Sequence, residues 1–402
     1  MHPADEIRGL KSNLLENKRI VLAVTGSIAA VETVRLAREL IRHGAIVIPV
    51  MTPAATRIIH PDALWFATGK KPIVELTGDT EHVRFCGRVD DPVDLMLIAP
   101  STANTISKIA LGIDDTAVTT FATTAIGSSR PILIVPAMHL SMFDHDIVQE
   151  NVVKLKEHGI EFVDPFFKDN KAKLASNDRI VARVIHLIGP HQLKDKNVLI
   201  IGGSTEEAVD DVRCLTNKSS GETAIALAKN SFFQGARVLL WYGQSKKPVP
   251  SFISTHRFRT ITDLKNLVEK ESLDSFDIIF VCAALSDYIP EKHAGKIDST
   301  AETLTIKCKK TDKILPLIRK SASNSKIIGF KLASSKNEAI AKAQKLLSSV
   351  QVDVVVANTI SSLDSKKQTV WMVSSEREPI RYSDLKDDVA LQILSFVSSV
   401  IT

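Results

Sequence analysis

The sequence predicts an α/β protein of two domains, each a mostly parallel sheet flanked by helices. The chain has 402 residues, which is more than one ordinary domain holds. From Arg19 onward, short β-branched runs alternate with longer amphipathic segments, the pattern of βαβ units around a buried parallel sheet. The pattern stops near Ile188 and restarts at Asn197, so we expect domains at 1–190 and 191–402.

Each domain has its own set of expected strands, with helices between them. In the first domain the expected strands are residues 19–24, 45–50, 93–99, 132–135 and 160–163. In the second they are residues 197–201, 236–241, 277–282, 326–330 and 353–357. A helix is expected at 337–347, and a last helix at about 382–401 should pack against the second sheet.

Composition and charge exclude several classes of protein. The N-terminus lacks the apolar core of a signal peptide, and no apolar run approaches the length of a membrane span. The four cysteines form no CxxC pair, which favours a reducing cytoplasm. Because the net charge is only +5 and the lysines are scattered, we expect anionic small molecules as partners, and neither nucleic acid nor membrane.

Glycine-containing turns follow the first strand of each domain. They read TGSIAA from Thr25 and GGSTEE from Gly202, and we expect a helix after each, the second beginning near Ser219. Neither completes GxGxxG, but a strand-to-helix turn still directs free N–H groups at an anion. Gly26 and Ser27 therefore form either a ligand site or a tight turn with a serine cap.

Two further polar turns should lie at the same edge of the first sheet. They are APSTAN, which contains Ser101, Thr102 and Asn104, and PAMH, which ends at His139. Small hydroxyl and amide groups suit contacts to a phosphate or to the edge of a ring. The alternative is that these residues merely cap helices.

Four motifs of the first domain, TGSIAA, EHVRF, APSTANTISKIALGIDD and PAMHLSM, resemble those of the homo-oligomeric flavin-containing cysteine decarboxylases. The resemblance covers about residues 18–159 and implies a Rossmann-like, flavodoxin-like fold that binds FMN. It implies His82 as the catalytic histidine, which would move or position a proton. It also implies flavin contacts from Gly26, Ser27, Ser101, Thr102, Asn104 and Met138.

The chain departs from this family at two places. His139 stands where the family usually has an asparagine that holds the departing carboxylate, and we expect His139 to take that role. The region of the family's mobile flap reads FFKDNKAKLASNDRIV and contains no cysteine, so the acid of the reduction step is unassigned. Lys171 or Lys173 could instead hold a substrate phosphate.

The second domain resembles a carboxylate-activating ligase from about residue 196 to 359. The motifs are GGSTEE, the R, TN and SSG elements, CAALSDY, HAGKI, GFK and AN; they contain Gly203, Arg213, Asn217, Asp287, Lys296, Phe330, Lys331 and Asn358. With the first domain, they make the chain similar to the bifunctional phosphopantothenoylcysteine decarboxylase and phosphopantothenate-cysteine ligase of coenzyme A biosynthesis.

This resemblance implies that CTP, with Mg²⁺, activates the carboxylate of 4'-phosphopantothenate as an acyl-cytidylate, which cysteine then attacks. Lys296 would offset phosphate charge in the first step and the Asn217 amide would donate to the oxyanion in the second. Gly203, Asp287, Phe330 and Lys331 would contact the nucleotide. Lys345 would replace a family lysine whose place is taken by Val350, and the metal ligands are unassigned.

Three alternatives differ from this reading. The chain could be a ligase whose flavoprotein half is not catalytic, a flavoprotein decarboxylase of another substrate, or a scaffold without activity. The family relatives imply a homo-oligomer in which decarboxylase trimers are joined by ligase dimers.

Overall fold

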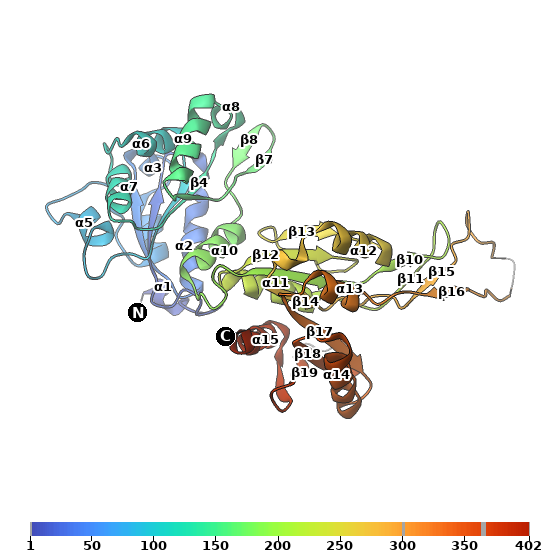
Figure 1. Cartoon of the computed structure of the whole chain (residues 1–402). Helices are drawn as coiled ribbons and strands as arrows, with labels where there is room; N and C mark the ends of the chain where they lie inside the picture. Colours follow the sequence, from blue (N-terminus) through green and yellow to red (C-terminus); the bar gives the residue numbers. More distant parts are fainter. Residues whose placement is uncertain (1, 300–301, 363–366, 402) are drawn as a thin grey trace. The chain divides into compact units, whose positions relative to one another are not determined.

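The chain folds into two compact units, Met1–Pro190 and His191–Thr402. The computed structural model describes residues 2–299, 302–362 and 367–401. Each unit has its own mostly parallel sheet with helices packed against it, as Figure 1 shows. The expected α/β class is therefore confirmed.

The sheet of the first unit has five parallel strands. In spatial order they are β2 (Ile46–Met51), β1 (Arg19–Val24), β3 (Leu95–Ser101), β4 (Ile132–Pro136) and β6 (Glu161–Phe162). The expected strands are confirmed to within two residues at each end. The chain order 2-1-3-4-5 is that of doubly wound flavodoxin-like folds, and it reverses direction between β1 and β3. Ligands of such sheets bind outside the carboxyl ends of the strands at this switch point.

Two groups of helices pack against this sheet. The first group is α1 (Pro3–Glu6), α2 (Thr33–Arg42), α4 (Pro61–Thr68) and α10 (Asn177–Ile188). The second is α5 (Glu81–Cys86), α6 (Ala103–Leu111), α7 (Ala117–Gly127) and α9 (Asp146–Glu157). The second group shares one core with alternate residues of the strands, among them Val21, Ala23 and Ile98. Short helices α3 (Pro53–Thr56) and α8 (Leu140–Phe143) follow β2 and β5.

The predicted flap is a hairpin of β7 (Phe166–Lys168) and β8 (Lys171–Lys173). Its turn residues Asp169 and Asn170 have φ of 53° and 54°, as a tight two-residue hairpin turn requires. Strand β8 also pairs with β5 (Met138–His139), so the hairpin extends from the turn that follows β4.

The sheet of the second unit has eight strands. In spatial order they are β13 (Ser254–Arg257), β12 (Arg237–Tyr242), β9 (Asn197–Gly202), β14 (Ile278–Val281), β17 (Lys326–Ala333), β18 (Val354–Thr359), β19 (Lys367–Val373) and β20 (Ile380–Leu385). All pairs from β13 to β18 are parallel, whereas β19 and β20 are antiparallel. The five expected strands are present, and β13, β19 and β20 are additional.

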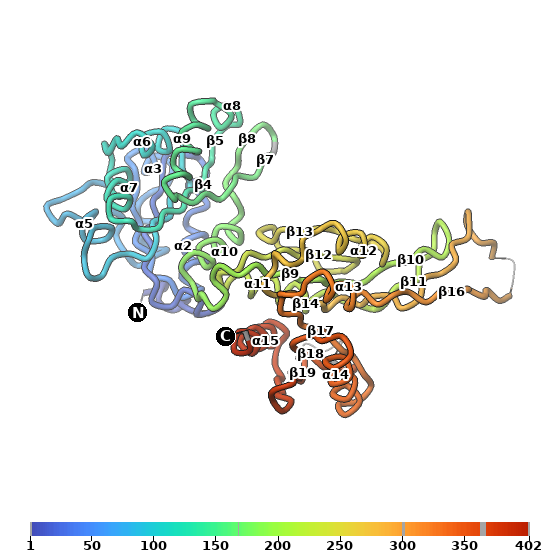
Figure 2. Tube along the Cα trace, viewed as in Figure 1, coloured from blue at the N-terminus to red at the C-terminus, as the bar shows by residue number. Residues whose placement is uncertain are grey.

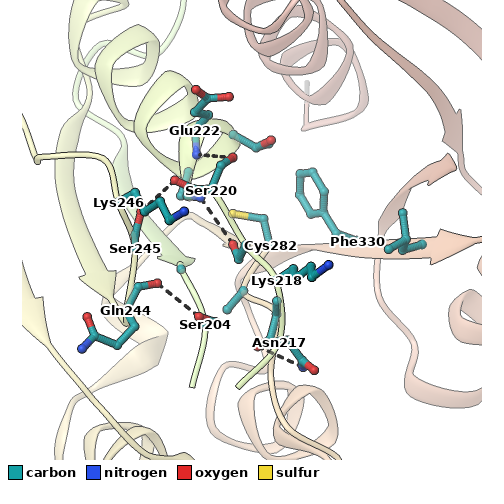
Figure 3. Close-up of a pocket in the computed structure, with 18 of the residues that line it drawn as sticks. Ser204, Asn217, Lys218, Ser220, Glu222, Gln244, Ser245, Lys246, Cys282 and Phe330 are labelled. Atoms are coloured by element: carbon teal, nitrogen blue, oxygen red, sulfur yellow. Dashed lines mark hydrogen bonds between the residues drawn. The ribbon is translucent and has the colours of Figure 1, made fainter. Parts of the chain in front are cut away.

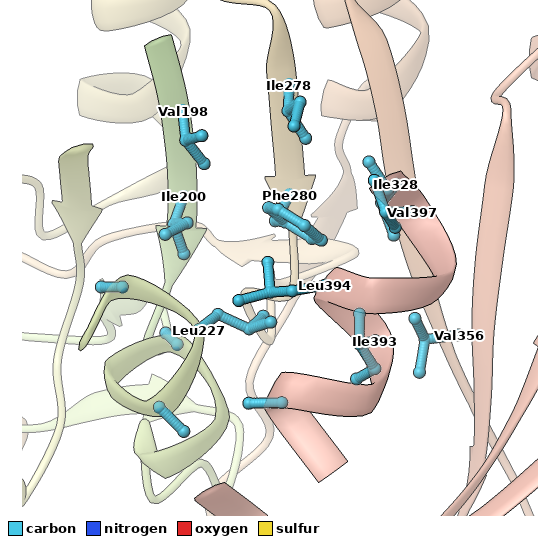
Figure 4. Close-up of a cluster of buried hydrophobic side chains, with 14 of the residues drawn as sticks. Val198, Ile200, Leu227, Ile278, Phe280, Ile328, Val356, Ile393, Leu394 and Val397 are labelled. Atoms are coloured by element: carbon cyan, nitrogen blue, oxygen red, sulfur yellow. The ribbon is translucent and has the colours of Figure 1, made fainter. Parts of the chain in front are cut away.

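Helices cover both faces of the second sheet. One face packs against α12 (Ile261–Lys270), α13 (Ile314–Ser321) and α14 (Lys336–Val350). The other packs against α11 (Glu222–Phe233) and α15 (Lys386–Ile401). Figure 4 shows Ile393, Leu394 and Val397 of α15 lying against Leu227 and the strand residues.

The expectation for the last helix is wrong in detail. This helix does pack on the sheet, but residues 380–385 form strand β20 and the helix begins at Lys386. The helix expected near Ser219 is α11, which begins at Glu222; between GGSTEE and this helix the chain also forms β10 (Glu206–Ala208), which pairs with β11 (Cys214–Thr216). A second hairpin, β15 (Tyr288–Pro290) with β16 (Cys308–Lys310), contacts β10 and runs beside it in Figure 2.

Candidate functional site

Three polar turns meet at the switch point of the first sheet. The buried Thr25 hydroxyl donates to the Pro100 carbonyl (2.8 Å) and accepts from the Thr102 N–H (3.1 Å). The Ser27 hydroxyl donates to the Ala137 carbonyl (3.0 Å). The turns after β1, β3 and β4 are therefore bonded to one another, as the sequence predicted for one sheet edge.

Three of the predicted flavin contacts lie where β3 ends and α6 begins. Ser101 is fully buried, and its Oγ has no hydrogen-bond partner among the residues described. Thr102 caps α6 by accepting from the Thr105 N–H (3.3 Å), and Asn104 is exposed on the first turn of that helix. Because a buried hydroxyl without a partner is costly, Ser101 has capacity for a ligand atom. This edge therefore fits a polar ring or phosphate.

Gly26 fits here because the chain passes close to α3. A Cβ built on Gly26 would lie 2.6 Å from the Ala54 Cβ, which excludes any side chain.

His139 and the hairpin lie together. His139 is exposed, precedes α8, and is opposite Lys171 in the register of β5 and β8, while Met138 is opposite Ala172. Lys173 is paired with Asp169 (2.8 Å). Lys171 is therefore better placed than Lys173 to meet an anion near His139.

His82 stands apart from these turns, in α5 between β2 and β3. Its Nδ1 is buried without a hydrogen-bond partner, and no hydrogen bond between described residues joins it to the switch point. Cys86 of the same helix is buried, which raises the pKa of its thiol to about 12. The thiol is therefore protonated at neutral pH, and it lies in α5 rather than in the hairpin of β7 and β8.

The second unit contains a pocket of about 790 Å³ at the carboxyl edge of its sheet. Five of the residues named from the ligase motifs line it, namely Gly203, Asn217, Phe330, Lys331 and Asn358. Figure 3 shows Phe330 on the opposite side of the pocket from Lys246 and Ser245. The pocket therefore brings together residues from β17 and from the turns that follow β9, β12 and β14.

A buried tyrosine holds the loop at the start of α11. The Tyr242 hydroxyl donates to Ser245 Oγ (2.7 Å), whose own hydroxyl donates to the Ser220 carbonyl (2.7 Å). Burial raises the pKa of Tyr242, so the phenol stays protonated and can donate. Gly221 has φ of 71°, and a Cβ there would lie 2.1 Å from the Tyr242 hydroxyl oxygen. Only glycine fits this position.

Asn217 is held by backbone carbonyls. Its Nδ2 donates to the carbonyls of Leu285 (2.9 Å) and Ala284 (3.3 Å), which follow β14. The neighbouring Thr216 hydroxyl donates to the Thr205 carbonyl (2.7 Å). The amide predicted to donate to an oxyanion is thus oriented by the turn after β14, and those two bonds compete with that role.

The pocket is rich in lysine, which the sequence interpretation largely missed. Four lysines and two glutamates line it: Lys218, Lys246, Lys331, Lys386, Glu206 and Glu222. Glu206 accepts from Arg259 (2.7 Å), and this bond holds the pKa of the carboxyl below its usual range. Lys386 comes from the start of α15, more than 160 residues after Glu222 with which it pairs. No local motif signals such a pairing.

Three predicted nucleotide residues do not line this pocket. Lys345 is exposed on α14, and Asp287 is paired with Lys313. Lys296 is exposed on the loop between β15 and β16, and its neighbour Ile297 donates its N–H to Asp210 Oδ2 (3.0 Å). Burial acts to raise the pKa of Asp210, but backbone N–H groups of Ile297 and Arg213 outweigh it and the pKa lies well below the usual range. The loop of Lys296 is thus tied to the hairpin of β10 and β11.

Neither a metal cluster nor a membrane span was found. Within residues 2–299, 302–362 and 367–401, no three histidine, cysteine, aspartate or glutamate side chains are grouped to hold a metal ion. Over the same described residues, no helix is both long and apolar enough to cross a membrane.

Comparisons with known proteins match both units. Residues 9–189 match the family described as Flavoprotein, and residues 193–400 match the DNA/pantothenate metabolism flavoprotein C-terminal domain. The chain is 43% identical over 380 residues to the Coenzyme A biosynthesis bifunctional protein CoaBC of Thermococcus kodakarensis, covering 94% of both chains.

Two further relatives have the same name. The CoaBC protein of Methanocaldococcus jannaschii is 40% identical over 365 residues, which cover 90% of this chain and 88% of that protein. A solved C-terminal domain of a CoaBC protein is 26% identical with a TM-score of 0.45, and the match covers 52% of this chain and 98% of that domain. The chain therefore belongs to the family of coenzyme A biosynthesis bifunctional proteins CoaBC.

Proposed function

We propose that the chain catalyses two successive steps of coenzyme A biosynthesis. The second unit joins 4'-phosphopantothenate to cysteine with CTP, and the first unit decarboxylates the resulting 4'-phosphopantothenoylcysteine to 4'-phosphopantetheine. The observation that carries this proposal is the identity of 43% over 94% of the chain to a protein named as a bifunctional protein of coenzyme A biosynthesis. The pocket of the second unit and the switch point of the first are the candidate sites of the two reactions.

The switch point of the first unit fits FMN. Ser101 Oγ is buried without a partner, Ser27 and Thr102 lie on adjacent turns, and Asn104 and Met138 flank them. When bound, FMN supplies a reversible oxidation of the thiol-bearing carbon, which makes loss of CO2 from the substrate feasible. The residues of this chain then have to bind the substrate and handle its charges and protons.

His139 and His82 take these roles. His139 is exposed beside Lys171, where one side chain can hold the departing carboxylate and the other the substrate phosphate. His82 Nδ1 is buried and unpartnered, which suits a group that exchanges a proton with the substrate. Because α5 lies apart from the switch point, we propose that His82 serves a site completed by a second copy of the chain. This agrees with trimers joined by ligase dimers.

The pocket of the second unit suits a triphosphate substrate. Four lysines offset phosphate charge, and Mg²⁺, when bound with the triphosphate, would supply further neutralisation. Attack by the carboxylate of 4'-phosphopantothenate on CTP gives an acyl-cytidylate and pyrophosphate. The amine of cysteine then displaces CMP.

Asn217 and Lys296 act at different stages. Asn217 lies in the pocket and its Nδ2 can exchange a carbonyl partner for the developing oxyanion. Lys296 lies on the loop next to the hairpins, so it reaches the phosphates only if that loop moves or another copy of the chain provides it.

We further propose that the enzyme works in the cytoplasm.

Mass-resolved turnover tests both halves in one reaction. Purified protein, checked for the visible absorbance of FMN, is mixed with 4'-phosphopantothenate, CTP, Mg²⁺ and cysteine. The expected products are 4'-phosphopantetheine, CMP, pyrophosphate and CO2. Accumulation of 4'-phosphopantothenoylcysteine would leave a ligase with a non-catalytic flavoprotein half, the alternative favoured by the flap without cysteine. Absence of CMP would refute the proposal.

A further inference from the structure

The start of the C-terminal helix contributes a charged group to the pocket of the second unit. Lys386 is the first residue of α15 and Glu222 the first residue of α11, and both side chains line the pocket. The Lys386 ammonium is paired with one Glu222 oxygen, and Lys247 is paired with the other at 2.8 Å. Two ammonium groups therefore share one carboxylate.

Helix stability does not explain why a lysine occupies the first position of α15. A lysine in the first turn of a helix meets the positive end of the helix dipole, which is unfavourable. Its side chain is also only 15% exposed, against 51% for Lys247, so its charge is largely removed from water. Such a position is costly unless an anion offsets it.

Packing of α15 against the sheet and against α11 does not explain the lysine at position 386 either. Leu394 and its neighbours bury the apolar face of α15 against the sheet. A second ion pair, Lys229 with Asp387 (2.7 Å), already joins α11 to α15 outside the pocket. The Lys386 pair is therefore redundant as a link between the helices.

The surrounding charges favour an anion in this place. Hydrogen bonds from Lys247 and Lys386 hold the pKa of the Glu222 carboxyl below its usual range, so the carboxylate is ionised and the three groups carry a net positive charge. Lys218, Lys246 and Lys331 add to this charge. A multiply charged phosphate compensates these ammonium groups better than one carboxylate does.

We propose that Lys386 binds a substrate phosphate in this pocket, and that the Glu222 carboxylate gives up Lys386 to that phosphate when the substrate binds. The inference rests on the proposed ligase function. Two substrates bear phosphate, CTP and 4'-phosphopantothenate. Before substrate binds, the Glu222 carboxylate compensates the charge of Lys386. It competes with the substrate phosphate for the Lys386 ammonium and so weakens phosphate binding.

The test compares three variants of the full chain. Lys386→Met removes the charge, Lys386→Arg keeps it, and Lys229→Met breaks the neighbouring pair of the same two helices outside the pocket. The KM for CTP and the KM for 4'-phosphopantothenate are measured separately. We expect Lys386→Met to raise one of them by about tenfold or more, since a charge-assisted contact is lost. The arginine variant should restore it, and Lys229→Met should leave both unchanged.

Direct binding provides a readout that does not depend on turnover. Isothermal titration with CTP and with cytidine separates contacts to the phosphates from contacts to the base. If Lys386 binds a phosphate of CTP, Lys386→Met weakens binding of CTP and not of cytidine. If Lys386 binds the phosphate of 4'-phosphopantothenate, the variant weakens binding of that substrate alone. Glu222→Gln should tighten binding of the same substrate. Tighter binding would also exclude Glu222 as a metal ligand.

The opposing results are equally definite. Unchanged KM values and affinities in Lys386→Met, or changes that Lys229→Met reproduces, would show that Lys386 has only a structural role. Weaker phosphate binding in Glu222→Gln would overturn the exchange. If the unmodified protein makes no CMP, the proposed function fails, whereas the titrations still decide whether Lys386 binds phosphate.

Discussion

The two sheet edges of this protein have the same architecture and different chemistry. At the switch point of the first unit, Thr25, Ser27 and Thr102 use neutral hydrogen bonds to join three turns. The pocket of the second unit has four lysines and two glutamates, several of which come from distant elements. A parallel sheet thus sets the edge at which a ligand can bind, while the side chains at that edge determine which ligand binds there.

The largest effect is expected from substitution of His82, which should affect decarboxylation and leave ligation intact. His82→Asn should lower the rate of decarboxylation of supplied 4'-phosphopantothenoylcysteine by about 10²–10⁴-fold, because a proton-transfer group is lost. Ligation should be unchanged. Product formation is measured by mass spectrometry, with His158→Asn, an exposed histidine after α9, as the control. Full decarboxylation by the His82 variant would remove this residue from the mechanism.

The reciprocal change is Asn217→Asp, which removes the amide donor and adds a charge next to the carbonyls of Ala284 and Leu285. We expect CMP release to slow by about 10²–10³-fold, as for loss of an oxyanion donor. The same sample should decarboxylate supplied 4'-phosphopantothenoylcysteine at the normal rate, which serves as its control. An equal loss in both assays would mean that the two sites are not independent.

A substitution in the core of the second unit compares the stabilities of the two units. Leu394 is 1% exposed in the core of the second unit, so Leu394→Ala should destabilise that unit by about 2–5 kcal/mol through lost burial and a cavity. With Trp65 of the first unit replaced by phenylalanine, tryptophan fluorescence during urea unfolding reports on Trp241 and Trp371 of the second unit, whereas flavin absorbance reports on the first. Ser395→Ala, an exposed change in the same helix, is the control. Early loss of flavin would contradict this assignment.

The smallest effect concerns the loop before α11. Tyr242→Phe removes the hydroxyl that bonds Ser245, and it should cost about 1 kcal/mol of unfolding free energy while raising the KM for CTP slightly. Tyr288→Phe, at a tyrosine that is 55% exposed, should change neither quantity. A variant at Tyr242 with unaltered stability would show that the loop is held by other contacts.

The regular parts of the fold followed from local patterns. Strands β1, β3, β4, β9, β14, β17 and β18 are mostly buried apolar runs, and each appears within a few residues of its expected place. Strand β20 overlaps the start of the last helix expected from the sequence, and its residues IRYSDL show no apolar alternation that would indicate a strand. An edge strand of this kind owes its structure to pairing with β19, which the local sequence does not encode.

The candidate sites were predictable to different degrees. Gly203, Asn217, Phe330 and Lys331 line the pocket because each belongs to a strand end or the turn after one, which a motif can identify. Lys246, Glu222 and Lys386 were missed. Lys296 and Lys345 belong to a loop and a helix that do not line the pocket, so residue type alone gave no guide to their position.

The sequence by itself determined two α/β units, the places of their main strands along the chain and the polar turns after those strands, because these depend on periodicity and short motifs. The tertiary structure alone decided which charges face one another. Glu222 and Lys386 are brought together by the packing of α11 against α15, and the turns of Thr25 and Thr102 by the pairing of β1 with β3. Contacts between residues so far apart in the chain arise from burial of apolar faces, which fixes where each helix and strand lies.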